Sequence, residues 1–375
     1  MSSPLVSLEN VEVHFDTNES IFDSVPLLDV GSKETVRAAD GVSFDIEEND
    51  VIALVGESGC GKTTLGKSTI GALRPTGGSV KYRGQDIWEA RDAEDPDIPF
   101  DEIRRSLQMI HQDPGASLNP NRTVLDSLER PLKKWFPEMG VEEREAMILD
   151  MLERVEMTPA EDYAHRYPHQ LSGGEQQRVA LVRALSVNPD LILADEAVSA
   201  LDVSLRVNVM DLFLEIQAEM NTSFVFISHN LSNARYLTKK AGGSIGIMYL
   251  GELVEFGPPE EVLQNPKHPY TEVLKWSTPE LFADNQSAMV EQPPVRTIDV
   301  PDPINPPSGC RFHTRCPEAR EECTRTTPDI ENIDDSGDHR AACFRNDPDH
   351  EYWESTELDS DRDRSGSEQA RGHSD

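Results

Sequence analysis

Residues 50–64 read DVIALVGESGCGKTT, and this stretch decides the fold of the chain. The run VIALV is short, continuous and apolar, which is typical of a strand buried on both faces of a parallel sheet. The eight-residue segment from Gly56 to Thr63 satisfies the pattern G-x-x-x-x-G-K-[ST], and a helical pattern follows it. A strand, a glycine-rich turn and a helix in this order form a phosphate-binding loop. The sequence therefore predicts an α/β fold that carries a nucleotide site.

Each residue type in this loop has a chemical reason. Glycines let the backbone wrap a phosphate, Lys62 is expected to reach the β- and γ-phosphates, and the Thr63 hydroxyl is expected to bind Mg²⁺. The predicted nucleotide-binding set of the loop is Gly56, Glu57, Ser58, Gly59, Cys60, Gly61, Lys62, Thr63 and Thr64. The alternative, a glycine-rich turn without function, is disfavoured because the flanking strand and helix are both indicated.

A second buried strand is indicated at 191–194, and two acidic residues end it in the segment LILADE. Asp195 is placed to hold Mg²⁺ through water, and Glu196 is placed to polarise an attacking water molecule. Two acidic residues after an apolar run can also be no more than the end of a strand. Their combination with a phosphate-binding loop favours the catalytic interpretation.

The segment LSGGEQQR at 171–178 is a second potential phosphate-binding turn, far from the first. Ser172, Gly173 and Gly174 precede a helical run, and the N–H groups and hydroxyl at such a helix start can bind phosphate. A single chain thus carries two phosphate-binding turns more than a hundred residues apart.

These motifs occur in the order seen in ATP-binding cassette (ABC) ATPases, which the chain resembles over residues 1 to about 275. The order also includes a glutamine loop, MIHQDPGASLNP at 109–120, then SALD at 199–202 and ISH at 227–229. The resemblance implies that the Ser172–Gly174 turn binds the γ-phosphate of the ATP held by an opposite subunit. Two chains, arranged head to tail, would then complete two ATP sites.

The resemblance also implies individual roles. Gln112 would bind Mg²⁺ and report the nucleotide state, Asp202 would link the two sites, and His229 would contact the γ-phosphate and hold the attacking water. Phe15 is expected to stack on adenine, with a core phenylalanine at a strand end as the alternative. The implied cofactors are ATP and Mg²⁺.

Several segments narrow the resemblance to the dipeptide/oligopeptide importer ATPases, and to the second ATPase subunit of the pair. They are QDPGASLNPNRTV, IMYLGELVEFG, HPYTEVL and SGCRFHTRCPEARE. The implied partners are a homologous ABC ATPase subunit in a heterodimer or homodimer, two membrane permeases and an extracellular substrate-binding protein. The implied location is peripheral, on the cytoplasmic face of the cell membrane. Importers of nickel complexes or sugars and non-transport ABC ATPases are alternatives. A redox regulatory protein that uses ATP only as a signal is disfavoured, because every catalytic residue of the ATPase motifs is present.

The predicted organisation has three parts. Residues 1–278 form the ABC ATP-binding domain, an α/β P-loop fold with a helical subdomain at about 108–185. Residues 279–345 form a small irregular extension that contains cysteines, and residues 346–375 form an acidic tail whose composition indicates disorder. The chain shows no apolar run of membrane-spanning length and no secretory signal.

The net charge of −34 restricts the possible partners. An acidic chain lacks the basic stripe that phosphate backbones require, so nucleic acid is not expected as a partner. Such acidity is typical of proteins that work in molar salt, where the Debye length falls to about 3 Å and self-repulsion is screened. An ordinary acidic protein is the alternative.

Four of the five cysteines follow the pattern C-x5-C-x6-C-x19-C at Cys310, Cys316, Cys323 and Cys343. Two disulfides are one interpretation, although they are rare in a reducing cytosol. A structural zinc site usually shows paired C-x2-C spacing, which is missing here. A 4Fe–4S iron–sulfur cluster is the alternative that the peptide-importer resemblance implies for some members. Four thiols that bind no metal are the fourth interpretation. Cys60 is interpreted as a small filler within the loop.

Overall fold

The computed structural model describes residues 3–16, 35–113, 118–199, 201–278, 281, 294–297, 299–333 and 337–358. The predicted polar excursion after Asp16, most of the glutamine loop beyond Asp113, and residues 359–375 lie outside these ranges. Within the described residues, no helix is both long enough and apolar enough to cross a membrane.

The main sheet is centred on the strand predicted from residues 51–55. Its strand order is β11-β12-β10-β9-β3-β8-β7-β6, with parallel pairing from β9 to β6 and antiparallel pairing from β9 to β11. Its strands are β3 (Val51–Val55), β6 (Leu107–Ile110), β7 (Leu191–Asp195), β8 (Ser223–Ser228), β9 (Ser244–Tyr249), β10 (Glu252–Gly257), β11 (Glu331–Asn332) and β12 (Arg340–Ala341).

A smaller antiparallel sheet packs beside it, in the order β2-β1-β4-β5. Its strands are β1 (Val6–Asp16), β2 (Thr35–Ile46), β4 (Gly77–Tyr82) and β5 (Gln85–Asp86). Alternate residues of β3 join two different apolar cores: Val51, Ala53 and Val55 face one, and Ile52 and Leu54 face the other. Because both faces of β3 are buried, polar and apolar residues do not alternate along this strand.

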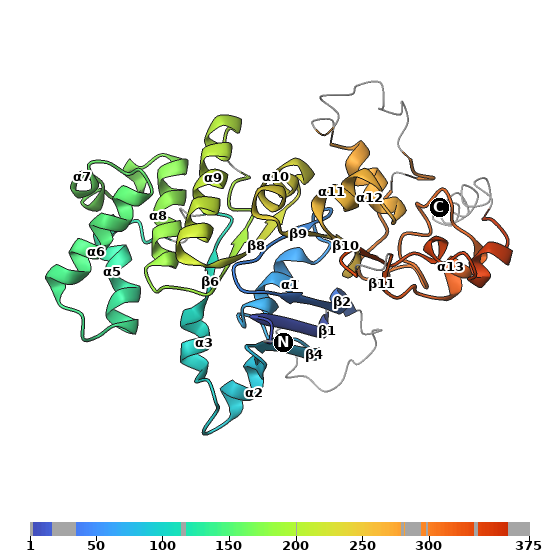
Figure 1. Cartoon of the computed structure of the whole chain (residues 1–375), viewed down its shortest axis with the longest axis horizontal. Coiled ribbons are helices and arrows are strands. Elements are labelled where there is room, and N and C mark those ends of the chain that lie inside the picture. Colours follow the sequence, from blue (N-terminus) through green and yellow to red (C-terminus); the bar gives the residue numbers. More distant parts are fainter. Residues whose placement is uncertain are drawn as a thin grey trace, which may run out of the picture.

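Helices cover both cores, and Figure 1 shows how they are distributed along the molecule. Helices α5 to α8 (green) lie at one end, the sheets lie in the middle, and the C-terminal extension (orange to red) lies at the other end. The α-helices are α1 (Lys62–Thr69), α2 (Ile87–Asp92), α3 (Phe100–Ser106), α5 (Val124–Trp135), α6 (Val141–Arg154), α7 (Ala160–Ala164), α8 (Gly173–Leu185), α9 (Val203–Met220), α10 (Leu231–Ala241), α11 (Pro259–Gln264), α12 (Pro269–Trp276) and α13 (Glu321–Arg325). Short 3₁₀ turns are η1 (Pro168–Gln170), η4 (Phe344–Asn346) and η5 (Glu351–Glu354).

Two predicted boundaries differ from the structure. The helical subdomain was predicted from about 108, but residues 108–110 belong to β6, because that strand pairs in parallel with β7 and completes the main sheet. The acidic tail was predicted to be disordered from 346, but residues 346–358 are folded. The Tyr352 side chain in this segment is buried, and its hydroxyl donates to the carbonyl oxygen of Glu318 at 2.7 Å.

The extension also joins the main sheet, through β11 and β12, and one buried carboxylate anchors it there. Glu255 of β10 has no exposed surface and accepts hydrogen bonds from the N–H groups of Lys267 and His268 at 2.8 and 3.0 Å. It also accepts from the Thr271 hydroxyl at 2.5 Å and contacts the His339 ring nitrogen at 2.8 Å. This carboxylate therefore connects the ATP-binding domain, α12 and the extension.

We expect Glu255→Ala to lower the free energy of unfolding by about 3 kcal/mol, because it leaves several buried donors without an acceptor. Urea unfolding followed by circular dichroism measures this, with Glu331→Ala as the control because Glu331 is an exposed residue of the same sheet. A loss below about 1 kcal/mol would contradict the anchoring role.

Candidate nucleotide site

The phosphate-binding loop occupies the end of β3 and the start of α1, where glycine is required for two different reasons. Gly61 caps α1 with φ of 103°, and a Cβ atom there would lie 1.7 Å from the carbonyl oxygen of Ala38. At Gly56 a Cβ atom would lie 2.2 Å from the carbonyl oxygen of Met248. The backbones of β2 and β9 thus pack directly against the loop. Glycine is required at these two positions because a Cβ atom would overlap that backbone.

Lys62 is the first residue of α1, and its ammonium is held by backbone oxygens of the loop. The side-chain nitrogen donates to the carbonyls of Gly56 at 2.8 Å and Glu57 at 2.9 Å, and the residue is only 5% exposed. Cys60 is buried beside it, and burial raises the pKa of its thiol, as expected of a small filler. A buried positive charge at the floor of the loop is what an anionic phosphate needs.

Two of the residues predicted to bind Mg²⁺ meet here, Asp195 at the end of β7 and Thr63 in the first turn of α1. The Thr63 hydroxyl donates to Asp195 Oδ1 at 3.0 Å. Asp195 is buried, and burial raises the pKa of its carboxyl group, against the opposing hydrogen bond from Thr63. A desolvated carboxylate beside a hydroxyl is an oxygen site that suits Mg²⁺.

Glu196 lies immediately beyond, in contact with two other predicted residues. Gln112 Nε2 donates to Glu196 Oε2 at 2.8 Å, and His229 Nδ1 lies 3.4 Å from Glu196 Oε1. The backbone of Glu196 has φ of 47°, in the left-handed region, and its N–H donates to the carbonyl of Ile227 at 3.0 Å. Strained backbone at such a position is typical of a functional site. The structure therefore gives the amide of Gln112 a contact with Glu196.

One cleft brings these groups together with the predicted adenine-stacking residue. Its lining includes the loop residues, Gln112, Glu196 and Phe15, whose ring is 43% exposed. An aromatic ring at the mouth of a phosphate cleft is available for stacking on a base. The cleft thus combines an aromatic side chain, residues of the phosphate loop and the carboxylate of Glu196.

The second phosphate-binding turn does not line this cleft. Ser172 caps α8, its hydroxyl accepts from the N–H of Glu175 at 3.3 Å, and the carboxylate of Glu175 accepts from the N–H of Ser172 at 2.6 Å. Ser172 and Gly173 are exposed, whereas Gly174 is buried against Leu205 of α9. Asp202 caps α9 nearby, accepting from the N–H of Leu205 at 3.0 Å. The turn is preformed by its own capping bonds and lies outside the cleft of its own chain.

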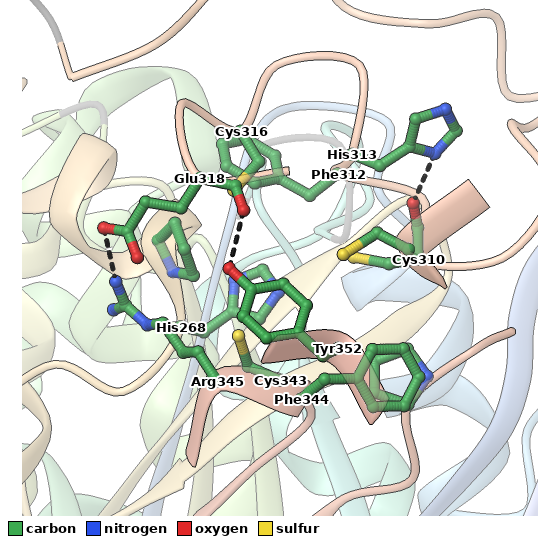
Figure 2. Close-up of a pocket in the computed structure, with 13 residues that line it drawn as sticks. His268, Cys310, Phe312, His313, Cys316, Glu318, Cys343, Phe344, Arg345 and Tyr352 are labelled. Atoms are coloured by element: carbon green, nitrogen blue, oxygen red, sulfur yellow. Dashed lines mark hydrogen bonds and ion pairs between the residues drawn. The ribbon is translucent and has the colours of Figure 1, made fainter. Parts of the chain in front are cut away.

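The four late cysteines converge on one cavity in the extension, together with Tyr352 and Phe312. Figure 2 shows Cys310, Cys316 and Cys343 around it, and Cys323 also lines it. All four are free thiols, so the predicted alternative of two disulfides is not what the structure contains. Burial raises the pKa of each thiol, to about 12 for Cys316 and about 11 for Cys343. Among the described residues, no three His, Cys, Asp or Glu side chains form a site for a single metal ion.

Sequence analysis did not identify the contacts that α12 and the extension make with the phosphate loop. Arg315 Nη1 lies 3.0 Å from Glu57 Oε1, and the Tyr270 hydroxyl accepts from the N–H of Glu57 at 2.9 Å. Both residues occur in segments quoted above only for their family resemblance. Their contacts depend on chain folding over more than 200 residues, which no local pattern signals.

Comparisons with known proteins agree with this geometry. The family model described as ABC transporter matches residues 39–199, and the model described as oligopeptide/dipeptide transporter, C-terminal region, matches residues 254–323. The putative oligopeptide transport ATP-binding protein YkfD of Bacillus subtilis (strain 168) is 39% identical over 331 residues, covering 88% of this chain and 93% of that protein. The dipeptide transport ATP-binding protein DppF of Escherichia coli (strain K12) is 37% identical, covering 93% of this chain and 96% of that protein.

A solved structure supports the fold independently. The ATP-binding cassette MJ0796, in a dimeric post-hydrolysis state bound to ADP and Pi, superposes with a TM-score of 0.54 at 30% identity. The match covers 66% of this chain and 96% of that one, so the part of this chain beyond the match includes regions that the cassette lacks.

Proposed function

This chain belongs to the ATP-binding proteins of the ABC transporters, and from that premise we propose that it drives import of di- or oligopeptides by hydrolysing ATP. The observation that carries the proposal is one cleft lined by the buried Lys62, the carboxylate of Glu196 and the ring of Phe15, with Asp195 bonded to Thr63 of the same cleft. The full-length similarity to proteins named for oligopeptide and dipeptide transport supports a peptide cargo. The ATP-binding chain is located on the cytoplasmic face of the membrane, where such subunits bind peripherally.

The residues at the cleft have separate roles in ATP binding and hydrolysis. Lys62 and the loop N–H groups bind the β- and γ-phosphates, and Phe15 stacks on adenine. Thr63, Asp195 and Gln112 would hold Mg²⁺, which neutralises developing negative charge on the phosphates when bound. Glu196 accepts a proton from the attacking water, and His229 keeps that water in line with the γ-phosphate.

The separation of the two phosphate-binding turns supports a dimeric mechanism. Ser172 and Gly173 are exposed, and they lie outside the cleft that contains Lys62. A turn of this kind can bind only the nucleotide of another subunit, so ATP is held between two cassettes. The proposed companion is a homologous ABC ATPase subunit, and Asp202, near the start of α9, links the two sites. Two membrane permeases and an extracellular substrate-binding protein complete the proposed importer.

We expect Glu196→Gln to lower the ATPase kcat by roughly 100-fold or more, because the general base is lost while the phosphate-binding groups remain. With Mg²⁺ and ATP, the variant and its companion should sediment as a closed dimer. Glu219→Gln on α9 is the charge-matched control, since that residue is exposed. Hydrolysis at the wild-type rate, or a closed dimer that still forms when Ser172→Ala is added, would contradict this mechanism.

The cargo is tested by reconstituting the chain with its companion, permeases and binding protein in proteoliposomes. A dipeptide or a pentapeptide, supplied with the binding protein, is expected to raise ATP hydrolysis severalfold over the basal rate. The Glu196→Gln complex provides the baseline without turnover. Stimulation by a nickel complex or a sugar, but by neither peptide, would replace peptide with that cargo.

For the cysteine cavity we propose a 4Fe–4S cluster. Four buried thiols around one cavity support it. The irons of a cluster each bind a separate thiolate, so its ligands lie further apart than those of one zinc ion. A bound metal would also stabilise the deprotonated cysteine thiolates, which burial by itself destabilises.

Protein purified anaerobically is expected to be brown, with iron and acid-labile sulfide in equal amounts. Cys316→Ser should lose the colour, and Cys60→Ser should keep it, because Cys60 lies in the phosphate loop. Colourless protein with one zinc per chain would indicate a zinc site, and protein without metal would indicate unligated thiols. The charge of −34 supports the hypothesis of a high-salt environment, so these assays are best run in both molar and low salt.

A further inference from the structure

The extension contacts the nucleotide site directly, through an arginine that lies between two of its cysteines. Arg315 follows Cys310 and precedes Cys316 in the chain. Its side chain is only 5% exposed, and Nη1 donates to both carboxylate oxygens of Glu57, at 3.0 and 3.2 Å. Glu57 is the second residue of the phosphate loop. A buried cation of the extension therefore pairs with a carboxylate of the loop.

Glu57 is fixed at three points, and one of them is the oxygen that holds Lys62. Arg315 binds its carboxylate, the Tyr270 hydroxyl accepts from its N–H at 2.9 Å, and its carbonyl accepts from Lys62 Nζ at 2.9 Å. A displacement of the Glu57 side chain would rotate this short peptide segment. The carbonyl that holds the lysine ammonium would move with it.

Arg315 is itself held rigidly. Its N–H donates to the carbonyl of Phe312 at 2.9 Å, and its own carbonyl accepts from the N–H of Arg296 at 2.8 Å. The guanidinium lies over the rings of Tyr249 and Phe312, at 5.8 and 5.6 Å from their centroids. Because these contacts restrict the Arg315 side chain, they fix the position of the positive charge that Glu57 binds.

A second arginine of the extension reinforces the same side of the loop. Arg311 Nε lies 3.0 Å from Glu252, and its other nitrogens donate to Asp40 and to the carbonyl of Leu250. The next residue, Gly251, donates its N–H to the carbonyl of Cys60 at 2.9 Å. The extension thus supports the phosphate loop directly at Glu57 and, through Leu250 and Gly251, at Cys60.

We propose that Arg315 is a positioning residue for ATP binding, which makes the cysteine-containing extension a structural part of the nucleotide site. The inference rests on ATP binding at the loop and is independent of the cargo and of any metal in the cysteine cavity. Arg315 touches neither ATP nor the reacting atoms. It acts through Glu57, which sets the carbonyl that holds Lys62.

The test compares Arg315→Met with a matched variant of the same extension, Arg320→Met. Arg320 is also largely shielded, but its partners among the described residues lie in the folded segment 346–358, away from the loop: Glu357 and the carbonyls of Trp353 and Ser355. We expect Arg315→Met to raise the Kd of a fluorescent ATP analogue and the KM for ATP roughly tenfold, since a charged hydrogen-bonded pair is lost. At saturating ATP, kcat should stay within about twofold, because Glu196 and its neighbours are untouched. Arg320→Met should change neither constant.

Two further variants keep the test decisive if Arg315→Met does not fold. Glu57→Gln should weaken ATP binding to a similar extent, and Arg315→Lys should recover part of the affinity because it keeps the charge. Glu57→Gln combined with Arg315→Met or Arg315→Lys should be no worse than Glu57→Gln alone. Additive losses, or an Arg315→Met variant with the ATP affinity of Arg320→Met, would overturn the inference. Wild-type protein that fails to bind ATP would instead contradict the proposed function.

Discussion

The ammonium group of Lys62 is buried against two backbone oxygens of the loop and the Cys60 sulfur, and these contacts organise the rest of the nucleotide site. A buried cation is costly unless oxygen atoms surround it, so the carbonyls of Gly56 and Glu57 have to point inward. That requirement bends the loop, and the bend brings Gly61 against the backbone of β2. The doubly buried strand β3 then serves as a rigid base for the loop. The site is consequently preorganised before any nucleotide arrives.

The parallel register of the main sheet places the remaining chemistry. Asp195 lies opposite Ile227, and Val55 lies opposite Ser228, so the ends of β3, β7 and β8 share one edge. Thr63, Glu196 and His229 extend from this edge toward one another across more than 160 residues of sequence. The Ser172 turn has no place at this edge, because α8 packs with the other helices of the helical subdomain. This separation in one chain is the physical basis for a site shared between two chains.

The extension changes how the ATP-binding domain ends. Its strands β11 and β12 continue the main sheet, and Glu255 binds donors from both sides of the junction. Arg315 of the extension binds Glu57 of the phosphate loop, and Arg311 binds the carbonyl of Leu250, next to the Gly251 N–H that donates to Cys60. Because these side chains are buried and charged, the extension and the loop share one network of polar contacts.

Features that depend on local pattern could be predicted from the amino-acid sequence. The phosphate loop, the strand that ends in Asp195 and the Ser172 cap follow from residue type and spacing, since each needs only a few consecutive residues. The spacing of the four late cysteines was visible too, but their arrangement in space was not. Three features emerged from the folded chain: the shared cavity of these cysteines, the packing of residues 346–358 against it, and the pairing of Arg315 with Glu57. These contacts join segments that are distant in sequence, and their partners are chosen by burial and charge after the sheet has formed. No local period or motif encodes that choice.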